Sequence, residues 1–518
     1  MTFLLACSQP CMEGYRADGD VCVVEELPRA EVLAPLPLLR RSAIELRGVL
    51  PTVEEAQRVL ADPSELRVLQ RAYLDDPLHE ERLVALLGEE WATYVDEPII
   101  PFFLLGLGSE QEQDYETSIA EEPLRLLARI AVEDRPFSDI VRADFTIGNP
   151  VLASIWPLEL SQDEGWSKAT WTDGRPRAGV LASNGFLWRY TSTESNANRG
   201  RAEQLTQRLV CHERLGEIGS LVPGGVEDAV REDPACLGCH VSLDPIAASM
   251  FGFLSYVPYA GLEAAYYHAD REPLGELTLG VEAAWYGRPV AGVEDLGAAI
   301  AEDPRFSPCQ VQTMASLLWR SEPTWERTSS LAATWDEGGQ RMRDLEESLV
   351  MAPEFGSVEP RLLTAEALRT VTEDLTGFVW TYLGLEAMRS SDRGVRTLAG
   401  GTDNVFVTRP ISQPTLGWTL TIQRLAEQSA RFAVTTELEE QRAGPLFAWV
   451  TLEDRPHDEA FELELESLRT RLHGRVPSEE LLELDRALWL DIEAAEGPAE
   501  AWSALVSLLL REPDFVSY

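Results

Sequence analysis

Apolar residues recur at helical spacing along most of the chain. Within residues 30–135, Thr52 and Glu55 match a capping box, and apolar residues follow them every three or four positions. A second capped amphipathic segment begins at Thr364. Helices with one apolar face bury that face against one another, so the pattern predicts a mainly α fold.

Prolines mark the expected ends of several helices. Asp76-Pro77 and Glu122-Pro123 predict breaks between helices, because proline has no N–H group to donate to the preceding turn. Three further segments share one design, in which a proline stops a helix and an aromatic residue two positions later turns back onto the core. These segments contain Pro304 and Phe306, Pro353 and Phe355, and Pro513 and Phe515.

Two stretches depart from the helical pattern. Between Leu277 and Pro289, aromatic and aliphatic residues alternate with glycines, which predicts a small β-hairpin. The most apolar stretch is Ile99 to Gly108, shorter than the ~18 residues of a membrane-spanning helix. It contains Pro101, so we interpret it as a buried core segment.

The length of 518 residues allows three or four domains of ~150 residues each. The pattern predicts a short start at 1–29, a helical domain at 30–135, a central region at 136–350 and a C-terminal helical domain at 351–518. Leu472 to Glu480 echoes Leu46 to Glu55. The two helical flanks are therefore expected to be distant copies that pack on either side of the central region.

Charge narrows the range of partners. The chain carries 87 acidic and 44 basic side chains, a formal net charge of −43 at pH 7, and Lys168 is the one lysine. Such a surface repels phosphate backbones and anionic lipid headgroups, which argues against nucleic-acid binding and electrostatic membrane docking. Negative charge favours a basic protein partner instead.

The first cysteine suggests export. Leu4-Leu5-Ala6-Cys7 is similar to the lipobox of bacterial lipoproteins, in which the cysteine carries the lipid. The preceding apolar run is shorter than the ~7–15 residues of a signal peptide, so we expect the natural start to lie further upstream. The alternative is an ordinary apolar N-terminus.

Four more cysteines are candidates for disulfides. Cys11 and Cys22 flank a segment of Gly and Asp turns and predict a small closed loop, which requires an oxidising compartment. Cys211 and Cys309 remain as a second pair, and the sequence does not decide whether they meet. Together these cysteines indicate a body in the periplasm or on the outer cell surface, tethered by lipid at Cys7.

The remaining two cysteines belong to a sharper motif. Cys236, Cys239 and His240 form a Cys-x-x-Cys-His sequence, the attachment signature of c-type haem. On a helix, cysteines three residues apart share a face and can form thioethers to the two vinyl groups, while the histidine binds the iron as proximal ligand. We therefore expect one covalent haem c. A zinc site, a redox dithiol and a haem site that has lost its function are the alternatives.

The sixth iron ligand is left open by the sequence. Met314 lies on a predicted helix and is the first candidate for the distal position, with His268 as an alternative and Met250 close to the motif. An open or water-bound iron is a further alternative. Asp244-Pro245 predicts a turn whose backbone carbonyl orients the proximal histidine.

The residues around this motif resemble a known family. Arg177 to Leu181, Arg199-Gly200, Leu209 to Cys211 and the run from Cys236 to Pro245 are similar to the cytochrome c-like uncharacterised domains in secreted proteins of planctomycetes and myxobacteria. The downstream segment from Tyr286 to Phe306 fits the same pattern. The resemblance spans about residues 130–325 and implies haem attachment through Cys236, Cys239 and His240. It implies no catalytic residue.

Three functional hypotheses follow. The first is an extracytoplasmic mono-haem electron-transfer protein with a basic redox partner. The second is a haem enzyme, peroxidase-like or ligand-binding, in which His268 or a carboxylate serves as the distal acid–base group. The third is a structural or interaction lipoprotein with incidental haem. Two other patterns are interpreted as structural: Ala399 to Asn404 as a flexible loop and Asp458 to Glu466 as a solvated helix face.

Overall fold

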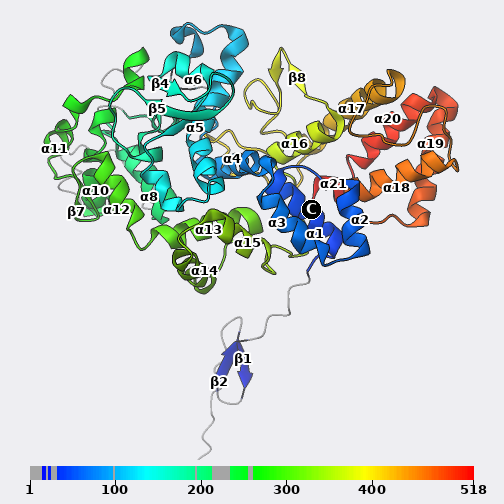
Figure 1. The fold of residues 1–518 in the computed structure, drawn as a ribbon, viewed down its shortest axis with the longest axis horizontal. Helices are drawn as coiled ribbons and strands as arrows, with labels where there is room; N and C mark the ends of the chain where they lie inside the picture. The colour runs from blue at the N-terminus through cyan, green and yellow to red at the C-terminus, as the bar shows by residue number, and fades with distance from the viewer. Residues whose placement is uncertain are drawn as a thin grey trace, which may run out of the picture.

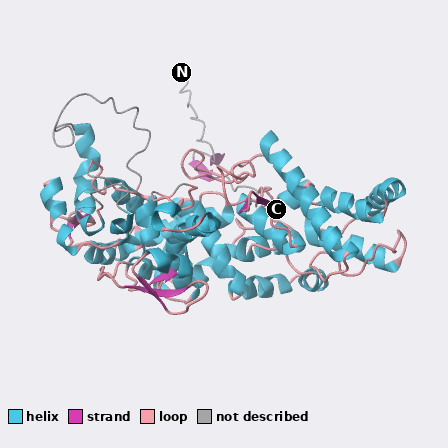
Figure 2. Ribbon diagram, turned by 90° about the horizontal axis from the view of Figure 1, so that it is seen from above, coloured by secondary structure: helices cyan, strands magenta, loops and turns pink. Residues whose placement is uncertain are grey.

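Helices dominate the computed structural model of the chain (Figure 2). They make up 59% of the structure and strands 6%, which confirms the predicted mainly α character. The structure describes residues 15–18, 21–24, 32–96, 98, 100–192, 195–212, 234–254 and 261–518. Cys7 and Cys11 lie outside the described residues, as does the side chain of Cys22, so the predicted lipid anchor and first disulfide stay predictions.

The helices follow one another through the described chain with few interruptions. Those before residue 255 are α1 (Pro35–Arg47), α2 (Val53–Ala61), α3 (Glu65–Leu74), α4 (Pro77–Trp91), α5 (Glu112–Val132), α6 (Pro150–Ile155), α7 (Asn184–Arg189), α8 (Arg199–Val210) and α10 (Pro234–Ala248). The later ones are α11 (Leu274–Leu279), α12 (Val293–Ala301), α13 (Phe306–Trp319), α14 (Trp325–Glu337), α15 (Met342–Val350), α16 (Ala365–Thr376), α17 (Leu416–Ala433), α18 (Glu459–His473), α19 (Glu479–Glu496), α20 (Pro498–Leu509) and α21 (Pro513–Val516).

The strands are short and antiparallel. The largest described sheet has the order β3 (Thr146–Gly148), β5 (Ser167–Trp171), β4 (Leu158–Leu160). Two-stranded pairs are formed by β1 (Tyr15–Asp18) with β2 (Val21–Val24), by β6 (Ala284–Trp285) with β7 (Arg288–Pro289), and by β8 (Thr381–Tyr382) with β9 (Leu385–Glu386). The predicted hairpin is therefore confined to residues 284–289, and the start of the expected segment, Leu277 to Leu279, belongs to α11.

Buried apolar residues form two clusters. The larger runs from Leu36 to Phe355, and the smaller runs from Leu363 to Val516 and also takes Ile44 and Leu50 from the first part of the chain. In Figure 1, α17 to α20 form one end of the molecule and α10 to α12 the other, with α1 to α4 and α16 between them. The predicted domain boundaries at 135/136 and 350/351 stay predictions.

Two buried arginines of α1 hold distant segments together. Arg40 donates to the backbone oxygens of Leu472, Phe515 and Ser517 at 2.6–3.0 Å. Arg41 donates to those of Phe355, Ser357, Glu359 and Tyr518 at 2.6–3.2 Å. The helical flanks therefore contact each other directly, and the expectation that they sit on either side of the central region is wrong.

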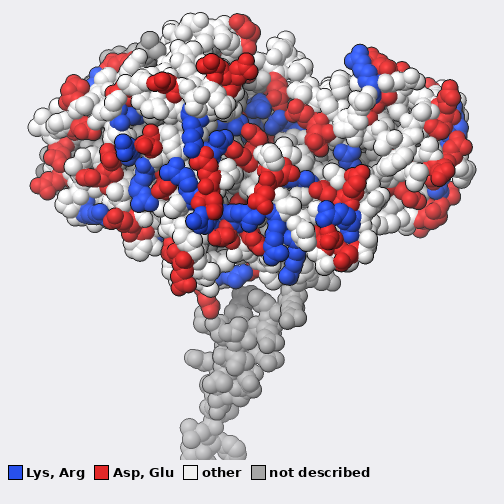
Figure 3. All heavy atoms as spheres, in the orientation of Figure 1, with Lys and Arg blue, Asp and Glu red and all other residues white. Residues whose placement is uncertain are grey.

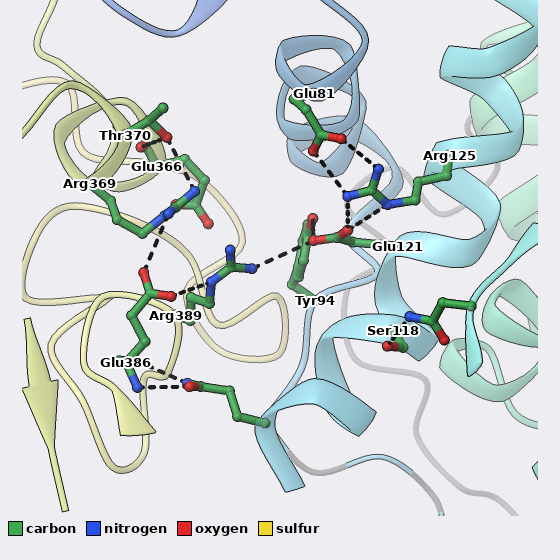
Figure 4. A network of polar contacts seen from close by, with 12 residues as sticks. Glu81, Tyr94, Ser118, Glu121, Arg125, Glu366, Arg369, Thr370, Glu386 and Arg389 are labelled. Atoms are coloured by element: carbon green, nitrogen blue, oxygen red, sulfur yellow. Dashed lines mark hydrogen bonds and ion pairs between the residues drawn. The ribbon is translucent and has the colours of Figure 1, made fainter. Parts of the chain in front are cut away.

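An ion-pair network fixes α5 to α4 and to the segment after α16 (Figure 4). Arg125 lies between Glu81 and Glu121, with N–O distances of 2.8 Å to each. Arg389 reaches Glu121 at 3.6 Å and Glu386 at 2.7 Å from the other side. A shared carboxylate of this kind couples the first part of the chain to the last.

The helix caps were predicted correctly. The Thr52 hydroxyl accepts from the Glu55 N–H at 3.2 Å, and Glu55 accepts from the Thr52 N–H at 2.8 Å. Thr364 caps α16 by accepting from the Ala367 N–H. In all three proline-stopped segments the aromatic residue is buried: Phe306, Phe355 and Phe515.

Pro123 does not break a helix, contrary to the prediction. It lies inside α5, where its missing N–H leaves the Ile119 carbonyl unpaired within the helix. Gly185 of α7 packs there so closely that a Cβ would lie 2.3 Å from that carbonyl oxygen. The Gly185 N–H donates to Glu122 at 2.8 Å. Tertiary packing thus accommodates the proline.

The most apolar stretch is only partly a buried core segment: Ile100 is buried, whereas the residues that follow it reach the surface. Its described part contains a short 3₁₀ turn, Phe102–Leu105, in which Phe103 is 62% and Leu104 55% exposed. The hydropathy of this stretch was a poor guide because the turn lies at the surface. No helix among the described residues is both long and apolar enough to cross a bilayer.

Candidate functional site

The predicted attachment motif lies at the start of α10, at one end of the molecule (Figure 1). This helix continues through Asp244 and Pro245 to Ala248, so the turn predicted there is wrong. Pro245 would pair with the carbonyl of Val241 if it had an N–H. Val241 is 72% exposed, so water can satisfy its carbonyl and the helix is not interrupted.

Cys236, Cys239 and His240 share the first two turns of α10. All three side chains are partly exposed, and a spacing of three residues places the two cysteines on neighbouring positions of one face. Leu237 and Val241, on the same turns, are 40% and 72% exposed. An apolar surface beside two accessible thiols suits a flat, hydrophobic group that covers it.

Asp244 orients the imidazole of His240. The His240 Nδ1–H donates to the Asp244 carboxylate at 2.8 Å, one helical turn further along α10. Nε2 therefore carries the lone pair, and no hydrogen bond of Nε2 is present among the described residues. This arrangement presents Nε2 to an incoming metal, as carboxylate-bonded histidine ligands do.

Arg199 at the start of α8 holds the carboxylate in place. Its Nε and Nη2 atoms donate to the two oxygens of Asp244 at 2.7 and 3.0 Å, in a bidentate pair. Burial favours the neutral form of Asp244, but the hydrogen bonds from Arg199 and His240 hold its pKa below the ordinary value. At neutral pH the carboxylate is ionised and faces the imidazole.

A disulfide anchors α8 to α13. Cys211 and Cys309 form a disulfide, so the structure joins the pair that the sequence left open. Gln310 on α13 also donates to the Arg208 carbonyl at 2.9 Å. Because α10 packs against α8, the histidine and its carboxylate rest on a cross-linked support.

These residues fit a covalent haem. The two cysteines are accessible, Nε2 of His240 is free of hydrogen bonds to the described residues, and an apolar surface adjoins them. Cys236 and Cys239 would hold the porphyrin through thioethers, and His240 would bind the iron on the proximal side. Among the described residues, no group of three or more His, Cys, Asp or Glu side chains is arranged to hold a metal ion.

The distal candidates have other roles in the structure. Met314 and Met250 are packed in the hydrophobic core, at 1% and 0% exposure. The Nε2 of His268 bonds to the Glu263 carbonyl at 3.1 Å, and its backbone N–H donates to Gly252. Their assignment as sixth ligand stays a prediction.

Sequence reasoning missed the polar partners of the histidine. It assigned the orienting group to a backbone carbonyl, whereas the structure uses the Asp244 side chain, and it gave Arg199 no role at the site. The four-residue spacing of His240 and Asp244 was the available signal, because residues four apart share a helix face. Arg199 gave no such signal, since 45 residues separate it from Asp244.

Comparison with known proteins does not assign this chain to a family. No family model, no curated protein and no solved structure matches the chain. The resemblance to cytochrome c-like domains of secreted proteins therefore stays a prediction, and functional inference rests on the site itself.

Proposed function

We propose that this protein is an extracytoplasmic mono-haem c-type cytochrome that transfers electrons. The observation that carries the proposal is the Cys-x-x-Cys-His motif on α10, with the His240 Nδ1–H held by an ionised carboxylate and Nε2 open. Haem iron would supply one-electron chemistry at this position by changing between its ferrous and ferric states. The chain supplies attachment, orientation and the electrostatic environment.

The residues around the histidine set that environment. A hydrogen bond from Nδ1–H to a carboxylate makes the imidazole a stronger electron donor than a bond to a neutral carbonyl. A stronger donor stabilises the ferric state and lowers the reduction potential. Arg199 moderates this effect, because its bidentate pair with Asp244 withdraws charge from the carboxylate.

The surface favours a basic redox partner. The net charge is −43, and acidic side chains are spread over the face drawn in Figure 3, at the end formed by α10 to α12 as well as at the end formed by α18 and α19. Opposite charge accelerates encounter and is screened by salt. The oxidising location that a c-type cytochrome requires agrees with the disulfide between Cys211 and Cys309, and lipid attachment at Cys7 would hold the protein at a membrane surface.

The direct test is a spectrum of the full chain, produced in a host that attaches haem c. We expect a Soret band, sharp α and β bands on reduction, and haem that stays with the protein in acidified acetone. Electron transfer to a lysine-rich redox protein should slow as ionic strength rises. A protein without a Soret band, or one that releases its haem in acidified acetone, refutes the proposal.

Substitutions of the two polar partners of His240 should shift the reduction potential in opposite directions. Asp244→Asn should raise the reduction potential by about 60–120 mV, the equivalent of a 10–100-fold effect on a one-electron couple. Arg199→Gln should lower it, because Asp244 then keeps its full charge beside the imidazole. Potentiometric titration of both variants measures the effect. Shifts of the same sign would show that the two residues serve only the fold, and His457→Gln, at an exposed position, is the control.

A haem enzyme is the second candidate. A proximal histidine bonded to a carboxylate also suits an iron that binds or activates a small ligand, because it favours the ferric state. Added cyanide distinguishes the haem enzyme from the electron carrier. A high-spin ferric spectrum that shifts with cyanide indicates an open distal position. An unchanged low-spin spectrum indicates a six-coordinate electron carrier.

A further inference from the structure

A cavity far along the chain from the haem motif has no role in the proposed electron transfer. Its volume is about 380 Å³, and its lining comes from three separate stretches, residues 93–120, 188–191 and 392–406. These stretches belong to the connection between α4 and α5, to α5 itself, to the end of α7 and to loops before α17. Cavities of this size are typical of small-ligand sites.

Carboxylates fasten the loops that form one wall. Asp96 accepts hydrogen bonds from the Ser390 hydroxyl at 3.0 Å and from the N–H groups of Ser391 and Asp392 at 2.7 and 2.5 Å. Asp403 accepts from the N–H groups of Val405, Phe406 and Val407 at 2.7–2.8 Å.

Asn404 fastens the same wall from the next position. Its side chain donates to the Tyr94 carbonyl at 2.8 Å, and its own carbonyl accepts from Arg189 at 2.6 Å. Hydrogen bonds of Asn404 thus hold the end of the loop from Ala399 to Asn404, whose predicted flexibility stays a prediction. A cavity with a fastened wall is organised before a ligand arrives.

The cavity is strongly acidic. Asp96, Glu116, Asp392 and Asp403 line it, while the guanidinium of the lining Arg189 is used by the Ala92 and Asn404 carbonyls. Burial, together with the nearby charges of Glu112, Asp96 and Asp392, raises the pKa of Glu116 to about 8, although Arg393 acts in the opposite direction at 3.4 Å. The carboxylates therefore repel one another, and a cation placed among them relieves that repulsion.

A buried hydroxyl in the same wall lacks a partner. Thr93 lines the cavity, is 2% exposed, and its Oγ1 has no hydrogen-bond partner among the described residues. A buried polar group without a partner costs free energy, and a hydrogen bond to it lowers that cost. A ligand that donates a hydrogen bond would satisfy it.

Apolar groups complete the lining. Ile119 and Trp188 are buried in the wall, and Phe406, 91% exposed, stands at the rim. A volume of about 380 Å³ is much larger than the ~30 Å³ of one water molecule, and so exceeds what a bare inorganic cation needs. An alkyl chain that ends in a positively charged group matches both the apolar and the acidic parts of the lining.

We propose that this cavity binds a primary alkylammonium group. The ammonium donates to the Glu116 and Asp392 carboxylates and to the Thr93 hydroxyl, and the alkyl chain lies along Ile119, Trp188 and Phe406. The group can belong to a free diamine or to a lysine side chain of a partner protein, since both present the same chemistry. Alkylammonium binding does not require haem attachment, so a failure of one proposal does not refute the other.

Calorimetric titration of the full chain tests the proposal with 1,5-diaminopentane as probe and 1,5-pentanediol as its neutral counterpart. We expect the diamine to bind and the diol not to bind. Glu116→Gln/Asp392→Asn should weaken binding at least about tenfold, because hydrogen bonds to charged groups are lost. At pH 9, where Glu116 is ionised, Asp491→Asn/Glu496→Gln, two exposed positions on α19, removes the same charge elsewhere and should change the affinity less than about twofold.

Thr93→Val separates binding from folding. Valine has the same shape and removes the unpartnered hydroxyl, so the melting temperature should not fall, while diamine affinity should drop about threefold. Affinity should also rise between pH 6 and 9, because Glu116 must lose its proton to pair with the ammonium. Glu116→Gln should abolish that pH dependence.

Each outcome is decisive. Binding of the diamine assigns the site to free amines, and binding of an Nα-acetyl-lysine peptide without diamine binding assigns it to a protein partner; both support an alkylammonium site. Equal loss of affinity in the α19 control overturns the proposal, because the ligand would then follow net charge alone. Displacement of the diamine by micromolar CaCl₂ overturns the ligand class in favour of an inorganic cation.

Discussion

Cys236→Ala/Cys239→Ala is expected to contain no covalent haem when produced in a host that attaches haem c. Both thioethers are lost in this variant, and His240 alone cannot retain haem through denaturation in acidified acetone. The measurement is the haem-to-protein ratio after extraction. Because both side chains are partly exposed, the substitutions should leave the helical circular dichroism unchanged.

Single substitutions sharpen this result. Cys239→Ala keeps one thioether, so its haem should stay attached and its reduced α band should shift to longer wavelength, because one vinyl group remains unsaturated. Cys236→Ala should behave in the same way. Full haem content in the double variant after extraction would show that attachment does not use this motif.

The second large effect is expected at Arg41. Arg41→Ala removes four hydrogen bonds from a charged donor and leaves the carbonyl oxygens of Phe355, Ser357, Glu359 and Tyr518 without it. We expect the free energy of unfolding to fall by about 3–5 kcal/mol, since a buried network is broken. Urea denaturation followed by tryptophan fluorescence measures the loss.

Two further variants test the cause. Arg67→Ala, at an exposed position on α3, should change the stability by less than about 0.5 kcal/mol. Arg41→Lys keeps the charge but loses the planar fork, so it should recover only part of the stability. A loss below about 1 kcal/mol in Arg41→Ala would show that water replaces the arginine at these carbonyls.

Local signals predicted local structure well. The capping box at Thr52 and the cap at Thr364 are confirmed, because each depends only on residues within one helical turn. The buried aromatic residues after Pro304, Pro353 and Pro513 are confirmed for the same reason. The prediction at Pro123 failed because a glycine 62 residues further along fills the space at the missing hydrogen bond.

Long-range polar contacts escaped the sequence analysis. The acidic run from Asp458 to Glu466 was interpreted as a solvated face, yet Glu464 is 1% exposed and accepts hydrogen bonds from the N–H groups of Ala448 and Trp449 at 2.8 Å. Carboxylates are so frequent in this chain that none stands out by type. The acidic cavity was also missed. Its carboxylates come from stretches almost 300 residues apart, so no local pattern brings them together.

The disulfide between Cys211 and Cys309 has a consequence for biogenesis. It closes a loop of 98 residues that contains α10. Two cysteines that form a disulfide and two that are proposed to bind haem therefore lie within one stretch. Four cysteines allow three complete pairings, and every one of them consumes the two thiols that haem needs. Cys211 and Cys309 meet only after α8 and α13 have packed, whereas Cys236 and Cys239 are accessible on the unfolded chain. For a haem-bearing chain, we infer a fixed order of maturation, in which the thioethers form first and the disulfide then closes behind them.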